Sequence, residues 1–474
     1  MTLTHAFIGG TSVAAAQTYD NIDPSTGQVI GPVSRGGGPE VDRAVDAAQG
    51  AQPGWASHRP EDRARVLTRL AALILRDQER LSRVESEDTG KPLTQARTDT
   101  VVCARYFEFY GHAIDSYYGH AMPLDETLHV YTRKEPFGVV GHILAWNYPL
   151  QLLARAAAPA VATGNAVVVK PADETPRTAV MVAELAVEAG LPAGVLNVVT
   201  GIGAEAGDAL ANHPGVAHLG FVGSAEVGAS IARAAADRLV PAVLELGGKS
   251  AQVVFPDADL ETAAGFVVKA ILQNAGQTCS AGSRLLAHDS IHDELLAMVA
   301  ERFEATSIGP GTADKDLGPL ISAKQQRRVE ELVATPHGGQ VVSGGKTPEL
   351  EGLSAGCYFA PTLIAGADPT SRIAREEVFG PVLVANRFST EQEAVELSNS
   401  TDYALLGAVW TSDVGRAHRL AGQIQAGQVF VNTYGAGGGV ELPFGGFKRS
   451  GYGREKGYEA LDNYTQTKTV IVRL

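Results

Sequence analysis

Three side chains in the sequence have the types that acyl-transfer chemistry needs: a thiol, a carboxylate and an amide. Cys279 is one of only three cysteines and lies among small and hydrogen-bonding residues in the stretch Asn274-Ala-Gly-Gln-Thr-Cys-Ser-Ala-Gly-Ser-Arg284. A reactive thiol needs close approach of its substrate and nearby donors for developing negative charge. Taken alone, the stretch equally permits a small buried hydrophobic residue, because free cysteine is among the most buried residue types.

Glu245 and Asn147 could serve the same reaction. Glu245 follows the apolar run 240–244, and a carboxylate at the buried end of a strand tends to have a raised pKa, which suits a general base near neutral pH. An ion pair with Lys249 is the alternative. Asn147 offers an amide donor for an oxyanion. With Cys279, these residues would supply a nucleophile, a base and an oxyanion donor.

Strand and helix patterns predict how such side chains are brought together. After residue 137, short apolar runs alternate with helical periodicity, which is typical of parallel sheets covered by helices. Strands are predicted at 138–144, 166–170, 196–199, 218–221, 242–246, 251–255, 284–287 and 428–431. Ligands bind at the carboxyl ends of such strands, so the residues that follow them are candidates for a binding site.

The N-terminal part is predicted to be mainly helical. Helical periodicity covers 39–49, a single long helix at 61–89 that stops at Gly90, and 96–114. An aromatic stripe in the third helix is interpreted as core packing rather than as a ligand contact: Tyr106, Phe107 and Tyr110.

Two glycine-containing turns could bind phosphate. The segment 221–228, Phe-Val-Gly-Ser-Ala-Glu-Val-Gly, follows a predicted strand and opens a helix, where backbone N–H groups attract anions. Gly201-Ile-Gly203 has a similar setting, and tight packing of helix on strand is the alternative for both. Lys170 could bind a ribose together with Asp173 or Glu174, with a solvated turn as the alternative.

The composition excludes several classes of protein. The chain has 474 residues, which predicts two or more domains, and its hydrophobic content of 45% with a mean hydropathy of −0.01 is ordinary for a water-soluble protein. A formal charge of −14 argues against nucleic acid or an anionic membrane as partner. No apolar run reaches the roughly 18 residues of a membrane span, and the N-terminus lacks the pattern of a signal peptide.

The cysteines and histidines predict neither disulfides nor a metal site. Cys103, Cys279 and Cys357 are far apart and odd in number, and no Cys-x-x-Cys or Cys/His metal spacing is present. The histidines are scattered and are interpreted as surface or packing residues. A reducing compartment fits this pattern, so we expect a cytoplasmic enzyme without a metal.

Seven motifs together resemble the NAD(P)-dependent aldehyde dehydrogenase superfamily, of the hydrolytic, non-acylating type, over nearly all 474 residues. No single motif would suffice, but their number, order and spacing make coincidence very unlikely. They are Trp146-Asn-Tyr-Pro149, Lys170-Pro-Ala-Asp173, Phe221-x-Gly-Ser-x-Glu-x-Gly228, Glu245-Leu-Gly-Gly-Lys249, Gly276-Gln-Thr-Cys279, Glu376-Glu-Val-Phe-Gly-Pro381 and Pro443-Phe-Gly-Gly446.

The resemblance implies an activity and a role for each reacting residue. Cys279 would attack an aldehyde as thiolate, and the Asn147 side chain with the Cys279 backbone N–H would hold the oxyanion. Hydride loss to NAD, with NADP not excluded, would leave a thioester, and Glu245 would activate the water that releases the carboxylic acid. The implied cofactor contacts are Ile143, Leu144, Trp146, Lys170, Asp173, Gly203, Gly207, Phe221, Gly223, Ser224, Leu246, Glu377 and Phe379. The implied substrate contacts are Tyr148, Arg155, Thr278 and Ser280.

The resemblance also implies an architecture. A Rossmann-like cofactor domain would cover 1–115 and 136–248, an α/β catalytic domain 249–447, and 448–463 would return to the cofactor domain. Two extended segments, 116–135 and 464–474, would form a β arm for a homodimer or homotetramer.

Departures from the family pattern bear on details. Ala145 replaces a proline, which loosens the turn before Asn147. Ala156 replaces a lysine linked to proton relay. Asp173 replaces glutamate and still disfavours a 2′-phosphate. Arg155 replaces an aromatic residue and could meet a polar or anionic group on a polar, aromatic or semialdehyde substrate, with an arginine that extends to solvent as the alternative. The run Gly435–Gly439 suggests a roomy pocket mouth.

Two rival functions remain at this point. A coenzyme A-acylating relative would lack the water-activating glutamate, so the presence of Glu245 argues against it. A non-catalytic structural relative would lose the nucleophile or the base, and both Cys279 and Glu245 are present.

Overall fold

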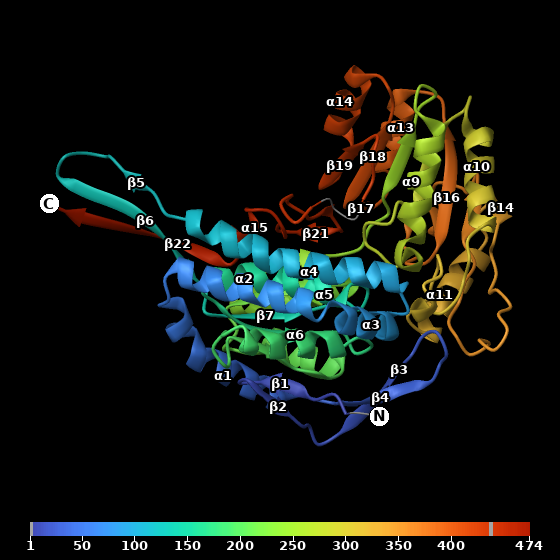
Figure 1. The fold of residues 1–474 in the computed structure, drawn as a ribbon. Helices are drawn as coiled ribbons and strands as arrows, with labels where there is room; N and C mark the ends of the chain where they lie inside the picture. The colour runs from blue at the N-terminus through green and yellow to red at the C-terminus, as the bar shows by residue number, and fades with distance from the viewer. Residues whose placement is uncertain (1–2, 436–438) are drawn as a thin grey trace.

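The computed structural model describes residues 3–435 and 439–474, which form two lobes and a projecting arm (Figure 1). The first lobe is built on an eight-stranded sheet in the order β2-β1-β9-β8-β7-β10-β11-β21. Its central strands are parallel, as the sequence predicts. They are β7 (Val139–Ile143), β8 (Ala166–Lys170), β9 (Leu196–Val198), β10 (His218–Val222) and β11 (Ala242–Glu245). The antiparallel strands are β1 (Ala6–Ile8), β2 (Thr11–Val13) and β21 (Gly451–Tyr452).

Both faces of this sheet are covered because its strands are apolar on both sides. In β8, Ala166 and Val168 belong to one core, whereas Val167 and Val169 belong to the other, as strand alternation requires. The first core includes residues of α1 (Gly38–Ala56), α7 (Asp208–Asn212) and α8 (Ala225–Arg238). The second includes residues of α2 (Pro60–Arg76), α4 (Leu93–Ala113), α5 (Pro149–Ala162) and α6 (Arg177–Glu188).

The single helix predicted at 61–89 is wrong, because the chain breaks at Asp77 into α2 and α3 (Gln78–Thr89). Asp77 has φ −95° and ψ 17°, and its carboxylate pairs with Arg76 and Arg80, so it closes one helix and opens the next. Gly90 ends α3 with φ 75°, as expected. The inner face of α3 is polar, with five buried side chains besides Leu81: Ser82, Glu85, Ser86, Asp88 and Thr89.

The second lobe has a seven-stranded sheet in the order β14-β15-β16-β13-β12-β18-β19, parallel except for β14. Its strands are β12 (Ala251–Val254), β13 (Arg284–His288), β14 (Gln340–Ser343), β15 (Thr362–Ala365), β16 (Val382–Phe388), β18 (Leu406–Trp410) and β19 (Gln428–Val431). Its helices are α9 (Leu260–Leu272), α10 (His292–Glu304), α11 (Ala323–Ala334), α12 (Arg372–Arg375), α13 (Glu391–Asn399) and α14 (Val414–Gln423). Two short strands, β17 (Tyr403–Ala404) and β20 (Phe447–Lys448), pair separately.

The two extended segments near 116–135 and 464–474 pair with each other. β22 (Thr465–Arg473) runs antiparallel along the whole of β6 (Leu128–Pro136), and β5 (Ala121–Met122) adds a third strand. Figure 1 shows this arm extending away from both lobes. α15 (Ala460–Asn463) leads into it, and β3 (Thr18–Ile22) pairs with β4 (Val29–Ser34) near the N-terminus. No helix within 3–435 or 439–474 is long and apolar enough to cross a bilayer.

Candidate active site

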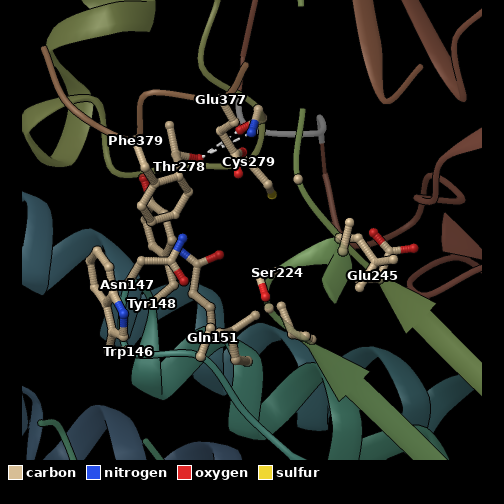
Figure 2. Close-up of a pocket in the computed structure, with 18 of the residues that line it drawn as sticks. Trp146, Asn147, Tyr148, Gln151, Ser224, Glu245, Thr278, Cys279, Glu377 and Phe379 are labelled. Atoms are coloured by element: carbon tan, nitrogen blue, oxygen red, sulfur yellow. Dashed lines mark hydrogen bonds between the residues drawn. The ribbon is translucent and has the colours of Figure 1, made fainter. Parts of the chain in front are cut away.

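A cavity of about 340 Å³ lies at the carboxyl ends of β7, β10 and β11, where segments of the second lobe close over the first sheet. Figure 2 shows Trp146 and Asn147 on one side, Cys279 and Phe379 on the other, and Glu245 at a strand end. Thirteen predicted site residues line it: Trp146, Asn147, Tyr148, Arg155, Gly223, Ser224, Glu245, Leu246, Thr278, Cys279, Ser280, Glu377 and Phe379.

Cys279 is the half-buried cysteine of the chain, whereas Cys103 and Cys357 are buried. The segment before it is strained: Asn274 and Ala275 both adopt left-handed backbone conformations, with φ 51° and 54°. Non-glycine residues in that region carry a conformational cost and occur where surrounding structure enforces them, often at functional sites. Burial, opposed by Arg155, raises the pKa of the Cys279 thiol to about 12, so the thiol is protonated at neutral pH.

Asn147 lies just before α5 and points its amide toward the same segment. Its Nδ2 donates to the Gln277 carbonyl at 3.0 Å, which leaves a second N–H of the amide for another acceptor. Its own carbonyl accepts from Asn274 Nδ2 at 2.9 Å. The amide of Asn147 is therefore bonded to Gln277, two residues before Cys279 in the chain.

Glu245 is a buried carboxylate, with 1% of its surface exposed, and neither of its oxygens has a hydrogen-bond partner. The alternative ion pair with Lys249 is absent, since the Lys249 ammonium also has no hydrogen-bond partner. Gly445 makes room for the carboxylate, because a Cβ there would lie 3.0 Å from Glu245 Oε1. Burial raises the pKa of Glu245 well above its usual value; Glu455 adds to the rise and Arg155 opposes it.

Arg155 does not extend to solvent, so that alternative is wrong. It is 7% exposed, forms an ion pair with Glu455, and lies over the Phe444 ring at 5.3 Å. Lys456 lies over the same ring at 4.8 Å and is 5% exposed. Burial and, next, the charge of Arg155 lower the pKa of Lys456 to about 8. Arg155, Lys456 and Glu245 thus all line the cavity.

The remaining predicted cofactor residues lie beyond this cavity, around the ends of β7 and β8. Lys170 is buried and forms an ion pair with Asp173, whose other oxygen accepts from Gly203 N at 3.2 Å. A Cβ on Gly207 would lie 3.8 Å from Ile143. Seven predicted residues belong to this outlying group: Ile143, Leu144, Lys170, Asp173, Gly203, Gly207 and Phe221.

Glu377 and Phe379 reach the cavity from the second lobe. Glu377 Oε1 accepts from Gly248 N at 2.8 Å, and burial raises the pKa of Glu377 to about 7. Phe379 has a left-handed backbone, with φ 57°, and its ring meets Trp146 edge to face at 5.2 Å. The two lobes therefore contact each other at the site through aromatic and carboxylate groups.

A second pocket of about 930 Å³, which we call the outer pocket, adjoins the cavity. The two share four lining residues: Tyr106, Gln151, Ser280 and Lys456. Gly435 and Gly439 line the outer pocket as the glycine-rich mouth predicts, whereas 436–438 lie outside the described residues.

Sequence reasoning missed several of these residues. Gln151 could have been found, because it lies four residues before Arg155, on the same face of α5. Tyr106 packs in the core as predicted but also borders the cavity. Glu455 and Lys456 carried no local signal, since they reach the site from the far end of the chain. The described residues contain no group of three or more His, Cys, Asp or Glu side chains placed to hold a metal.

Comparisons with known proteins agree with this geometry. The model of the aldehyde dehydrogenase family matches residues 12–470. A solved structure described as a putative aldehyde dehydrogenase from Burkholderia cenocepacia is 49% identical, with a TM-score of 0.97, covering 99% of this chain and 100% of its own. An indole-3-acetaldehyde dehydrogenase of P. syringae with NAD+ and IAA is 38% identical at TM-score 0.97, covering 99% and 96%. Betaine aldehyde dehydrogenase from Staphylococcus aureus with NAD+ is 36% identical at TM-score 0.97, covering 99% and 97%.

Proposed function

The chain belongs to the aldehyde dehydrogenase family, and on that premise we propose that it oxidises an aldehyde to the carboxylic acid with NAD+. The observation that carries the proposal is the meeting of Cys279, Asn147 and Glu245 in one cavity between the lobes. These residues come from three separate segments and supply a nucleophile, an oxyanion donor and a base.

Cys279 is the nucleophile. Its thiolate attacks the aldehyde carbon, the C–S bond forms, and the carbonyl oxygen becomes an oxyanion held by the Asn147 amide and the Cys279 backbone N–H. Because the free thiol has a raised pKa, it must lose its proton as the substrate reacts. That proton passes to water, and Arg155 favours the thiolate by its charge.

Glu245 serves the second half of the reaction. Once hydride loss has left a thioester on Cys279, Glu245 takes a proton from water as the oxygen attacks the acyl carbon. The C–S bond then breaks, which releases the acid and restores the thiol. A coenzyme A-acylating enzyme has no need of this base, so a buried carboxylate beside Cys279 favours hydrolysis.

The cofactor residues fit a dinucleotide. Two glycines leave space beside Lys170 and Ile143. A Cβ on Gly203 would lie 3.7 Å from Lys170 Nζ, and a Cβ on Gly207 would lie 3.8 Å from Ile143. The N-terminus of α8, with Ser224 as its cap, lines the cavity where a pyrophosphate gains from the helix dipole. Asp173 and Lys170 would hold the adenosine ribose, and Glu377 the other ribose beside Phe379.

Bound NAD+ supplies the hydride acceptor. A carboxylate at Asp173 disfavours a 2′-phosphate by charge repulsion, so we propose NAD rather than NADP as the physiological cofactor. The remaining predicted contacts would border the adenine and nicotinamide: Ile143, Leu144, Trp146, Gly203, Gly207, Phe221, Gly223, Ser224 and Leu246.

We propose a polar aldehyde as substrate. We take the outer pocket as the entrance for the aldehyde. Four residues line both it and the cavity, and all of them can form hydrogen bonds: Tyr106, Gln151, Ser280 and Lys456. Tyr148 and Thr278 complete the inner wall. The guanidinium of Arg155 is already paired with Glu455.

The architecture supports the expected domains. We propose a cofactor-binding domain at 1–115 and 136–248, built on the first sheet, which 448–463 rejoins; the pairing of β21 with β11 supports this. We propose a catalytic domain at 249–447, built on the second sheet. We propose that the arm, 116–135 and 464–474, mediates a homodimer or homotetramer. Catalysis through a reduced thiol also fits the cytoplasm.

The test of the proposed function is a cysteine replacement. Cys279→Ala should abolish NADH formation from aldehydes, while Cys357→Ala, at a buried thiol outside the cavity, should leave it unchanged. A panel of aliphatic, aromatic, hydroxy- and semialdehydes, without coenzyme A, would identify the preferred class. Wild-type rates from Cys279→Ala would overturn the assignment.

A further inference from the structure

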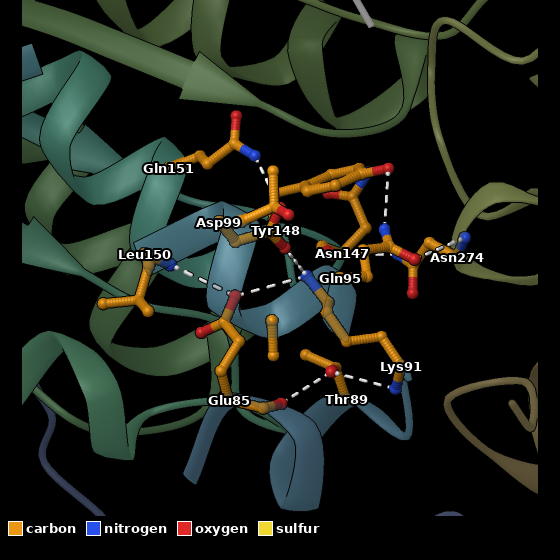
Figure 3. Close-up of polar contacts among 12 residues, drawn as sticks. Glu85, Thr89, Lys91, Gln95, Asp99, Asn147, Tyr148, Leu150, Gln151 and Asn274 are labelled. Atoms are coloured by element: carbon orange, nitrogen blue, oxygen red, sulfur yellow. Dashed lines mark hydrogen bonds and ion pairs between the residues drawn. The ribbon is translucent and has the colours of Figure 1, made fainter. Parts of the chain in front are cut away.

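Three charged side chains are buried together beneath the N-terminal turn of α5 (Figure 3). Lys91 Nζ lies 3.2 Å from Glu85 Oε1 and 2.5 Å from Asp99 Oδ2, and the side chains are 0%, 0% and 2% exposed. We call these three residues the Lys91 network. Replacing such buried ion pairs by neutral groups of similar shape is often harmless or stabilising. Stability alone therefore does not explain why these charges are here.

The Lys91 network holds the chain directly after Asn147. Asp99 Oδ1 accepts from Gln151 Nε2 at 2.7 Å, and Lys91 Nζ lies 4.4 Å from the centre of the Tyr148 ring. Glu85 Oε1 accepts a longer bond from Leu150 N at 3.5 Å. The capping residue Tyr148 makes no side-chain cap to α5, so Glu85 supplies the negative group that favours this helix terminus.

A second connection reaches Asn147 from the other side. Gln95 Nε2 donates to the Tyr148 hydroxyl at 3.4 Å, and Gln95 Oε1 accepts from Asn274 N at 3.1 Å. Asn274 Nδ2 donates to the Asn147 carbonyl at 2.9 Å and to the Gln277 carbonyl at 3.2 Å. The main chain of Asn147 is thus connected to Lys91 in two ways. One runs through the first turn of α5. The other runs through Asn274, in the strained segment that precedes Cys279, and then through Gln95 and the Tyr148 ring.

We propose that the Lys91 network is the positioning centre of the oxyanion site. Lys91, Glu85 and Asp99 touch neither the thiol nor an oxyanion; they fix the first turn of α5 and, through it, the direction of the Asn147 amide. The inference rests on the proposed role of Asn147. Donor placement matters because removing one oxyanion donor from an enzyme costs about 10²- to 10³-fold in kcat.

The decisive variant replaces all three residues at once by neutral groups of similar shape: Lys91→Met with Glu85→Gln and Asp99→Asn. Burial, opposed by Lys91, raises the pKa of Glu85 to about 7, so a neutral glutamine is a close substitute. Because no charge remains unpaired, the fold should persist with an unchanged or higher Tm. We expect kcat to fall about tenfold or more while KM for NAD+ stays within about twofold.

A matched control lies on the same helix. Asp88 is buried and bonds Arg177 Nε at 2.6 Å, in a pair that contacts neither α5's first turn nor residues 274–279. The double variant Asp88→Asn with Arg177→Met should leave kcat unchanged. If the triple variant also keeps kcat within about twofold with its fold intact, the inference is wrong. A kcat that falls only in proportion to the folded fraction would overturn it too.

A milder variant tests the second connection if the triple variant fails to fold. Gln95→Met removes both hydrogen bonds that join Tyr148 to Asn274, whereas Gln95→Glu keeps the acceptor for Asn274 N. We expect a severalfold loss of kcat in the first and recovery in the second; equal activity in both would contradict the proposal. Asn147→Ala, measured alongside, distinguishes failure of this inference from failure of the proposed function. Full activity in Asn147→Ala would refute the proposed function itself.

Discussion

Burial disfavours the charged forms of Cys279 and Glu245. It raises the pKa of Cys279 to about 12 and that of Glu245 well above its usual value. A neutral carboxyl group cannot take a proton, so the reaction depends on the fraction of Glu245 that is ionised. The surrounding charges set that fraction, since Glu455 disfavours the carboxylate and Arg155 favours it.

Replacement of the base should separate the two halves of the reaction. In Glu245→Gln we expect a burst of NADH followed by slow turnover, because the thioester forms but its hydrolysis lacks a base, a loss of about 10²- to 10⁴-fold. Stopped-flow absorbance of NADH measures both phases. Glu294→Gln, at an exposed glutamate of α10, is the control. A steady state without a burst would contradict this role.

The pH dependence of hydrolysis should respond to Glu455. The base works only when deprotonated, so activity falls as the pH drops through the pKa of Glu245. Glu455→Gln removes the negative charge that raises this pKa and leaves Arg155, which lowers it, to act without its partner. We therefore expect the acid limb of the kcat profile to move to lower pH. Glu441→Gln, at the exposed partner of Arg105, should leave the limb in place, and a shift to higher pH in Glu455→Gln would oppose the argument.

At the scale of the elements, the carboxyl ends of adjacent parallel strands deliver the functional groups. β7 leads to Asn147, β8 to the Lys170–Asp173 pair, β10 to Ser224 and β11 to Glu245. The helices that follow place their N-termini toward the same edge, where they favour anions. On the proposed assignment, adjacent strand ends divide the tasks of binding a dinucleotide and of acyl chemistry.

The strand end of β8 should control the choice of cofactor. In Asp173→Ser the repulsion of a 2′-phosphate is removed, and we expect the ratio of kcat/KM for NADP to that for NAD to rise about tenfold, which corresponds to ~1.4 kcal/mol. Steady-state kinetics with both cofactors measure the ratio. Glu174→Gln tests the neighbouring carboxylate, and a larger change there would assign the ribose contact to Glu174 instead.

At the scale of the whole molecule, the arm exposes apolar side chains that neither lobe covers. Ile471 is 64% exposed, Val472 43% and Leu474 79%, and the strand that carries them lies outside both sheets (Figure 1). Burial of these side chains in a second copy would recover apolar surface at about 25 cal/mol per Å². The projecting shape thus fits the proposed assembly.

A charge placed on the arm should prevent that assembly. We expect Ile471→Glu to yield a smaller species than wild type in analytical ultracentrifugation, because burying an unpaired carboxylate is costly. Val414→Glu, at an exposed valine on α14 of the second lobe and outside the arm, is the matched control and should keep the wild-type mass. An Ile471→Glu protein of unchanged mass would exclude this end of the arm from the interface.

Local sequence patterns determined the α/β class and most strand positions, and they predicted the three residues that we propose to react. The strand predicted at 166–170 is β8 without change, because a run of apolar β-branched residues between turns has few alternatives. Cys279, Glu245 and Asn147 were recognisable because their types suit one chemistry and their motifs resemble one family.

The tertiary structure decided what depends on contacts between distant residues. The break at Asp77, the Arg155–Glu455 ion pair and the pairing of β22 with β6 join groups that no local period connects. The Lys91 network is of the same kind, since its residues lie on α3, on the turn that follows it and on α4, and act on α5. Hydrophobic periodicity reports which face of an element is buried; which charges meet there is settled only when the elements pack.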